Sequence, residues 1–207
     1  MKARKAIAIT LAAALLVTAS VFGTIAWLTQ ETDPVVNVFH DSDIQITLTE
    51  SKGTVDNQDA TKHNFEMIPG FTIEKDPLVT VAAGSEDCFV FIKVTEAVGE
   101  GVSFEFDNIL EYTIAEGWVP LEGHDGVYYR EVASAERNQE FKVLKDDEVR
   151  VLEDVSKDML NEIKGGTNLE PTLTFKAYAI QKYKTNEVAF TELQAWEKVR
   201  EIGRAHV

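Results

Sequence analysis

Apolar and polar residues alternate along most of the chain beyond residue 43, which is the spacing of strands with one buried face. Ile44, Ile46 and Leu48 alternate with polar neighbours. The segment CFVFIKV at 88–94 is apolar at both odd and even positions, so it predicts a central strand covered on both sides. The same pattern predicts further strands at 78–83, 102–106, 110–114, 117–121, 126–132, 140–144, 148–152 and 171–182.

Turn and helix signals separate these strands. The polar segment 53–64 is expected to be an exposed loop, and turns are expected at 122–126 and 145–147. Helices are predicted at 156–164, which begins with a serine and is followed by two glycines, and at 191–200. Short strands at this spacing predict one mainly all-β domain over residues 43–200, an antiparallel jelly roll or β-sandwich with a few short helices.

The N-terminus has the layout of an export signal. Lys2, Arg4 and Lys5 precede an uncharged, apolar run over 6–28. A run of this length could also remain as an uncleaved helix across a bilayer. Its alanine-rich composition favours cleavage, and Thr24 and Ala26 supply small residues before a cut at Trp27. Residues 1–26 are therefore expected to be a cleaved signal peptide, which places the rest outside the cytoplasm.

Charge and cysteine content narrow the function classes. The chain has 35 acidic and 20 basic residues and a formal charge of −15, which disfavours nucleic-acid partners. Cys88 is the only cysteine, so no intrachain disulfide can form. It lies in an apolar strand after Glu86 and Asp87, which favours a buried thiol over a catalytic nucleophile.

Catalytic and metal motifs are weak, and no catalytic residue or cofactor is predicted. The sequence contains no HExxH, GxSxG or P-loop motif. His63 and Glu66 are the best metal candidates, but they supply two ligands where zinc needs three or four from the protein. His40 and His124 stand beside acidic residues in similar loop pairs.

The large aromatic residues Trp118, Tyr128, Tyr129 and Trp196 are expected to pack in the core or at its edge. The alternative is an exposed aromatic patch, for example around Trp118, on a cell-surface module that binds a glycan or a host protein.

The last residues, Glu201–Val207, are interpreted as foreign. Their reverse translation matches the start of a common sequencing-adapter sequence, whose next triplet is a stop. The natural chain is therefore expected to continue differently after Arg200, and the alternative is that these residues are a genuine C-terminus.

Three segments resemble the TasA/camelysin (CalY) family of Gram-positive bacteria. The first is GTIAWLTQETDPVVNVFHDSDIQITLTE at 23–50, across the expected cleavage site. The second is MIPGFTIEKDPLVTVAAGSEDCFVFIKVTE at 67–96, and the third is TLTFKAYAIQ at 172–181, which precedes a helix containing Ala195 and Trp196. One departure is Ser42, where the family has glycine.

The resemblance implies a secreted jelly-roll protein that forms extracellular fibres of a biofilm matrix. Such proteins are exported with a signal processed by a SipW-type signal peptidase, and their partners are further copies of themselves and other matrix proteins. The resemblance also implies that the extended segment 27–42, with Val35, Val36, Val38 and Phe39, inserts as a strand into the next copy. A secreted camelysin-like metallo-endopeptidase is the alternative, and its site would need His63, Glu66 and another carboxylate.

Overall fold

The computed structural model covers most of the expected domain and one short N-terminal strand. The described residues are 29–31, 44–56, 59, 61–166, 168–185 and 187–205. Several predicted positions lie outside them: the cleavage site at Thr24, Ala26 and Trp27, and the assembly residues Val35, Val36, Val38 and Phe39.

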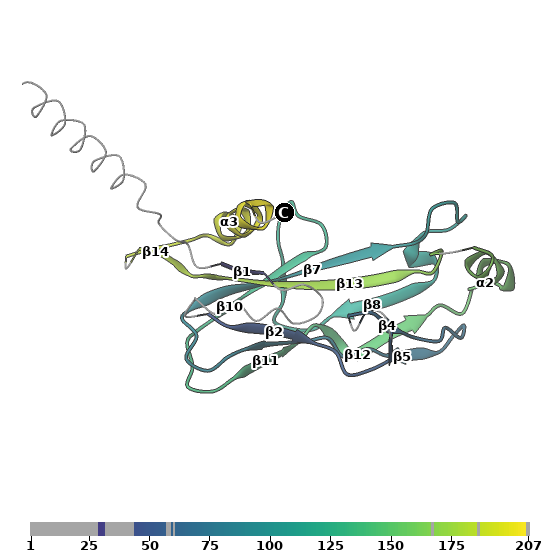
Figure 1. Cartoon of the computed structure of the whole chain (residues 1–207), viewed down its shortest axis with the longest axis horizontal. Helices are drawn as coiled ribbons and strands as arrows, with labels where there is room; N and C mark the ends of the chain where they lie inside the picture. Colours follow the sequence, from purple (N-terminus) through teal and green to yellow (C-terminus); the bar gives the residue numbers. More distant parts are fainter. Residues whose placement is uncertain are drawn as a thin grey trace, which may run out of the picture.

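A five-stranded antiparallel sheet forms one layer (Figure 1). Its strands in spatial order are β1 (Thr29–Glu31), β13 (Thr172–Gln181), β7 (Cys88–Ala97), β10 (Val127–Val132) and β9 (Val119–Pro120). The longest pairing joins β7 and β13 over ten residue pairs, from Thr172 opposite Ala97 to Gln181 opposite Cys88.

Two three-stranded antiparallel sheets form the opposite layer. One contains β11 (Gln139–Lys142), β6 (Leu78–Val81) and β2 (Ile46–Thr49); the other contains β5 (Thr72–Glu74), β12 (Leu144–Val151) and β8 (Leu110–Ile114). Backbone hydrogen bonds connect the two, with Val143 donating to Pro77 at 3.0 Å and Lys75 to Asp147 at 2.8 Å. Two hairpins project from the layers, β3 (Thr54–Val55) with β4 (His63–Asn64) and β14 (Tyr183–Thr185) with β15 (Val188–Ala189).

One of the two α-helices of the described chain lies at an end of the molecule, and the other covers a face of the five-stranded sheet. Besides a 3-10 turn, η1 (Phe106–Asn108), the described chain has α2 (Lys157–Lys164) and α3 (Glu192–Ala205). Helix α3 lies over the outer face of the five-stranded sheet, and α2 lies at the end of the molecule opposite β14 (Figure 1). Among the described residues, no helix has the length and apolarity required to cross a membrane.

The core confirms that β7 is covered on both faces. Cys88, Val90 and Ile92 point into the main cluster between the layers. Phe89 and Phe91 point the other way, into a second cluster under α3. All five are at most 2 % exposed. Burial of this central strand on both faces explains why its sequence lacks polar alternation.

The mainly β prediction is confirmed, but two local predictions are wrong. Residues 102–106 do not form a strand; Phe104 and Phe106 are buried from a loop and from η1. Residues 145–147 are not a turn between strands but lie inside β12, whose pairing with β8 shifts register there. Asp146 and Asp147 adopt φ of 58° and 57°, a left-handed conformation that aspartate tolerates and that accommodates a bulge.

The other predicted elements agree with the structure, with small changes at their ends, whereas β5, β14 and β15 are not among the predicted strands. Ser156 caps α2 by accepting a hydrogen bond from the Met159 amide at 3.2 Å. The segment 53–64 is largely exposed as expected, but its ends pair as β3 and β4. The last helix continues past Arg200 to Ala205, through part of the segment interpreted as foreign.

The thiol of Cys88 is predicted to be unreactive in the folded protein. Burial, and then the Asp87 carboxylate, raises its pKa to about 12, so little thiolate exists near neutral pH. Ellman's reagent should modify no cysteine in the native chain and one per chain in denaturant. Rapid reaction without denaturant would contradict the burial of Cys88.

Candidate functional site

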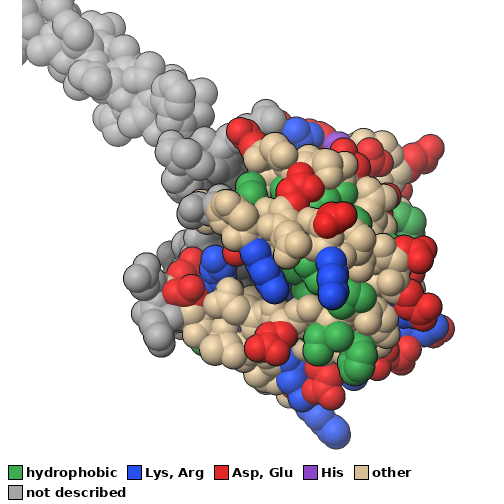
Figure 2. All heavy atoms as spheres, turned by 90° about the vertical axis from the view of Figure 1, so that its right-hand side faces the viewer, with side chains coloured by type: hydrophobic (Ala, Val, Ile, Leu, Met, Phe, Trp, Pro, Cys, Tyr) green, Lys and Arg blue, Asp and Glu red, His purple; other side chains and the backbone are tan. Residues whose placement is uncertain are grey.

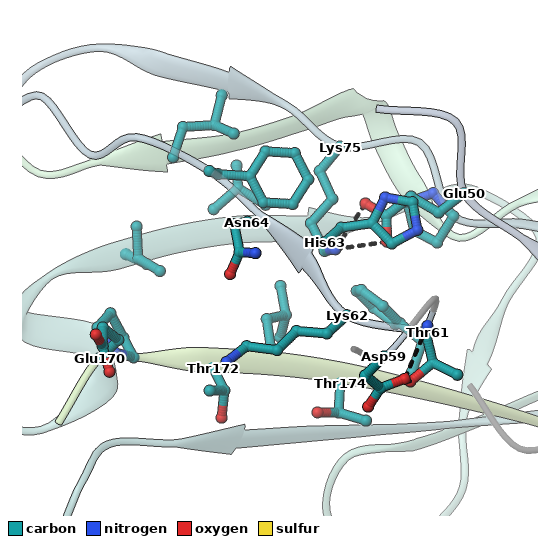
Figure 3. Close-up of a pocket in the computed structure, with 18 of the residues that line it drawn as sticks. Glu50, Asp59, Thr61, Lys62, His63, Asn64, Lys75, Glu170, Thr172 and Thr174 are labelled. Carbon is teal, nitrogen blue, oxygen red and sulfur yellow. Dashed lines mark hydrogen bonds and ion pairs between the residues drawn. The ribbon is translucent and has the colours of Figure 1, made fainter. Parts of the chain in front are cut away.

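A groove runs between the two layers on the side where β13 and β2 approach each other (Figure 3). Its volume is about 470 Å³. The walls come from the end of β2, the β3–β4 hairpin, the segment around Lys75 and the beginning of β13. Residues that β13 contributes to the lining are Thr172, Leu173, Thr174 and Phe175.

A buried ion pair lies in the groove. The Lys75 ammonium donates to both carboxylate oxygens of Glu50, at 2.7 and 2.8 Å (Figure 3). The two side chains are only 10 % and 16 % exposed, respectively. The same ammonium lies 4.9 Å from the centre of the Phe65 ring and 5.5 Å from that of Phe175. This one cation therefore connects β2, the hairpin and β13 around the groove.

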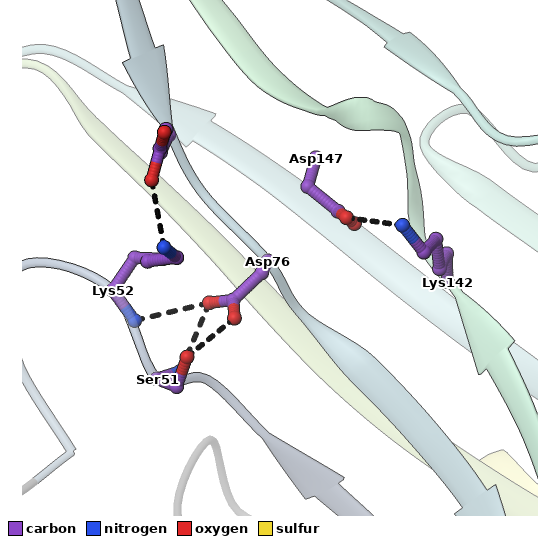
Figure 4. A network of polar contacts seen from close by, with 6 residues as sticks. Ser51, Lys52, Asp76, Lys142 and Asp147 are labelled. Atoms are coloured by element: carbon purple, nitrogen blue, oxygen red, sulfur yellow. Dashed lines mark hydrogen bonds and ion pairs between the residues drawn. The ribbon is translucent and has the colours of Figure 1, made fainter.

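Further polar contacts follow the ion pair along the same two segments (Figure 4). The Ser51 amide and hydroxyl donate to the Asp76 carboxylate at 2.9 and 2.6 Å, and the Lys52 amide donates to it at 3.0 Å. The Lys52 ammonium bonds Glu74 at 2.7 Å. Residues 50–52 thus bind to residues 74–76 through several polar contacts. These contacts hold the wall of the groove in place at the end of β2.

These contacts shift the titration of Asp76. Partial burial by itself raises the pKa of Asp76, but the hydrogen bonds from the Ser51 hydroxyl, the Ser51 amide and the Lys52 amide outweigh it. The folded protein therefore holds this pKa below its ordinary value of 3.8. At neutral pH the Asp76 carboxylate is therefore ionised and accepts these hydrogen bonds.

The edge of β13 that borders the groove also carries β1. Thr29, Gln30 and Glu31 lie opposite Ile180, Ala179 and Tyr178. The strand β1 thus occupies one end of this edge, and the groove lies along the other end. These three residues lie within the segment 27–42 that is predicted to be an extended donor strand, whereas the assembly residues named in it, Val35, Val36, Val38 and Phe39, are outside the described residues. The pairing of 29–31 itself has no signal in the sequence, because Thr29, Gln30 and Glu31 are all polar.

The structure separates the two metal candidates. Nδ1 of His63 lies 2.7 Å from the Lys52 carbonyl, so this nitrogen carries the proton and donates. His63 lines the groove, whereas Glu66 is exposed and is not part of the lining. Within the described ranges, no three His, Cys, Asp or Glu side chains gather as a metal site would require.

Among the other candidates, His124 and the two tryptophans make contacts within the fold, and His40 is outside the described residues. Nε2 of His124 lies 3.5 Å from Glu197 on α3. Trp118 and Trp196 are 7 % and 4 % exposed, which confirms that both pack in the interior. Trp118 also donates to the Lys142 carbonyl at 2.8 Å, and because its ring is buried it is not part of an exposed aromatic patch.

Comparisons with family models, with curated proteins and with solved structures returned no match. The resemblance to the TasA/camelysin family stays a prediction. The function proposed below therefore rests on the geometry of the β13 edge.

Breaking the buried ion pair is predicted to destabilise the protein strongly. Glu50→Gln leaves the Lys75 ammonium buried without its counter-charge, a loss of about 3 kcal/mol in the free energy of unfolding. The matched control is Glu74→Gln at the neighbouring exposed pair, expected to change stability by less than about 0.5 kcal/mol. Urea unfolding measures both, and similar losses in the two variants would contradict the role given to burial.

Asp76 is predicted to contribute stability that acid removes. A carboxyl whose pKa is lowered on folding stabilises the native state above its unfolded pKa, and this contribution disappears as pH falls through the folded value. Wild type should therefore be more stable than Asp76→Asn at neutral pH, with a difference that shrinks below pH 3.8. Urea unfolding across this range tests the sign; a difference that grows on acidification would refute it.

Proposed function

We propose that this protein is a secreted structural protein whose copies polymerise into extracellular biofilm-matrix fibres by exchanging their N-terminal strands. In this proposal the domain is a jelly roll, and the strand that passes between copies includes β1. The activity is assembly, so the relevant site is the β13 edge with the adjoining groove.

The observation that carries the proposal is the way β1 is attached. It adds to a sheet edge through only three residue pairs, Thr29–Glu31 with Tyr178–Ile180. Residues 32–43 then connect it to Ile44, where the packed core begins. An edge strand on a tether is the arrangement from which strands exchange, because the same backbone hydrogen bonds can form with another copy.

The closed monomer and the strand-exchanged form should differ little in free energy, because the β1–β13 backbone hydrogen bonds that break within one copy form again between two copies. A short tether gives the chain's own strand a high effective concentration, of the order of millimolar, which favours the closed monomer. An exchanged strand needs additional contacts to compete. The strand β13 is ten residues long and pairs with β1 over three, so a donated strand could extend its pairing toward Thr172–Phe175 in the groove.

The position of β1 is also consistent with assembly that begins only after the signal peptide has been removed. Thr29 follows shortly after the expected cut before Trp27, so cleavage would leave β1 close to the new N-terminus. An N-terminus still joined to the signal would stay at the membrane, where it could not reach the β13 edge of a distant copy. Cleavage by a SipW-type peptidase would then start assembly outside the cell.

The test is filament formation by the chain that starts at Trp27. Electron microscopy should show filaments, whereas deletion of 27–39 should leave monomers in size-exclusion chromatography. Gln30→Pro should act like the deletion, because proline removes an amide donor at the centre of β1 and restricts φ. Gln30→Thr is the matched control and should polymerise like the parent chain.

The two truncation outcomes separate the mechanisms. Polymerisation of the deletion variant at the parent's concentration would exclude strand exchange. A parent chain that remains monomeric at every soluble concentration would exclude a fibre protein of this kind.

A further inference from the structure

We propose that consecutive copies also touch end to end, with the turn 68–71 of one copy packed against the β14–β15 hairpin of the next. This contact rests on the proposed strand exchange and assigns the surfaces that would stabilise it. The partner is a second copy of this chain, and the contact is heterologous, so it repeats without closing.

The first surface is an apolar turn at the end of the molecule near α2. Ile68 is 49 % exposed, and Phe71 is 62 % exposed, the largest exposure among the exposed large hydrophobic residues of the described chain. The turn is held by backbone bonds, with Phe71 donating to Ile68 and Gly70 to Val151, both at 3.0 Å. Figure 2 shows this end, where green hydrophobic side chains reach the surface among red acidic ones.

The surroundings of this turn are polar, as at the rim of a protein interface. Gly70 lies against the Glu153 side chain, which accepts from Arg150 at 2.8 Å. Glu66 is exposed just before the turn. An apolar centre with a charged rim marks a contact surface better than an isolated hydrophobic residue does.

The second surface is at the opposite end (Figure 1). Tyr183 and Val188 on the β14–β15 hairpin are 43 % and 51 % exposed, and Leu193 at the start of α3 is 40 % exposed. The hairpin is anchored, because the Phe190 amide donates to the Lys182 carbonyl at 2.8 Å and the Lys184 ammonium donates to Gln194 at 2.6 Å. Both surfaces are thus presented by fixed backbone.

The direction of β1 determines which ends must meet. Along β13, β1 runs from Ile180 toward Tyr178, so the chain leaving Glu31 heads toward the Thr172 end of the copy that receives it. The donor's own core begins at Ile44. The next residue, Gln45, donates its amide to the Ser85 hydroxyl and accepts from the Ala82 amide, and both partners lie shortly before the start of β7. That is the hairpin end of the donor, because β7 starts where β13 ends.

The tether length then limits the gap between the two bodies. Residues 32–43 span at most about 40 Å when fully extended. Passing the rest of β13, from Tyr178 to Thr172, takes roughly 20 Å of that. The donor's hairpin end is therefore held within about 20 Å of the acceptor's end that carries Ile68 and Phe71.

Cysteine cross-linking tests the contact in assembled protein. Phe71→Cys and Val188→Cys are introduced together into the chain that starts at Trp27, and the filaments are oxidised. Because the two positions lie at opposite ends of one copy, a disulfide between them must join neighbours and should give a ladder on a non-reducing gel. The control pair Glu140→Cys with Val188→Cys, whose first member is on the edge strand β11, should give no ladder.

A second measurement uses the apolar turn directly. Ile68→Ser with Phe71→Ser should raise the concentration at which filaments appear about tenfold, the factor expected for removing a half-exposed aromatic side chain from an interface. Its urea unfolding should match the parent, since both side chains are exposed in the monomer.

The outcomes distinguish this contact from the strand exchange beneath it. Filaments without a ladder, or filaments that form at the same concentration after the serine substitutions, overturn the end-to-end contact and leave the exchange standing. A parent chain that forms no filaments overturns the exchange, and the contact fails with it.

Discussion

The ladder between β7 and β13 is the constraint on which the rest of the molecule depends. Ten residue pairs hold these strands together at the centre of the five-stranded sheet, and side chains on both faces of β7 are buried. One face forms the main core with the opposite layer, and the other receives α3. With β7 bound on one side, β13 presents its other side to β1 and the groove, so the central ladder creates the edge proposed for assembly.

The wall of the groove opposite β13 is held in place by contacts within its own layer. Glu50 and Lys75 join the end of β2 to the segment between β5 and β6, and the contacts of Asp76 continue this connection. The Lys75 ammonium also reaches across to the Phe175 ring on β13. A buried ion pair contributes little net stability compared with apolar packing, but each charged group must stay close to its partner to remain neutralised. The main effect of the Glu50–Lys75 pair is therefore to fix the position of the end of β2 relative to the β3–β4 hairpin and to Phe175.

Much of the fold could be predicted from the sequence, because strand and helix signals are local. The doubly apolar run at 88–94 indicated a strand with two buried faces, and Ser156 indicated a helix start. The bulge at Asp146 and Asp147 was missed, since left-handed aspartates occur in turns and bulges alike. The groove could not be predicted, because it arises from contacts between segments far apart in sequence, such as Glu50 with Lys75 and Phe65 with Phe175 across one ammonium. The segment 27–42 could be predicted to be extended, but the pairing of 29–31 with β13 could not, because it depends on backbone pairing with a distant strand and not on apolar alternation.

The pairing of β1 with β13 joins nearly the first and nearly the last strand along the chain. Contacts of such long sequence separation form late and slowly, because a large loop must close first. During synthesis from the N-terminus, Thr29–Glu31 is therefore made long before residues 172–181, the strand on which it docks. If copies assemble as proposed, the order of these two segments in the polypeptide means that a chain can accept a strand only after nearly all of it has been made.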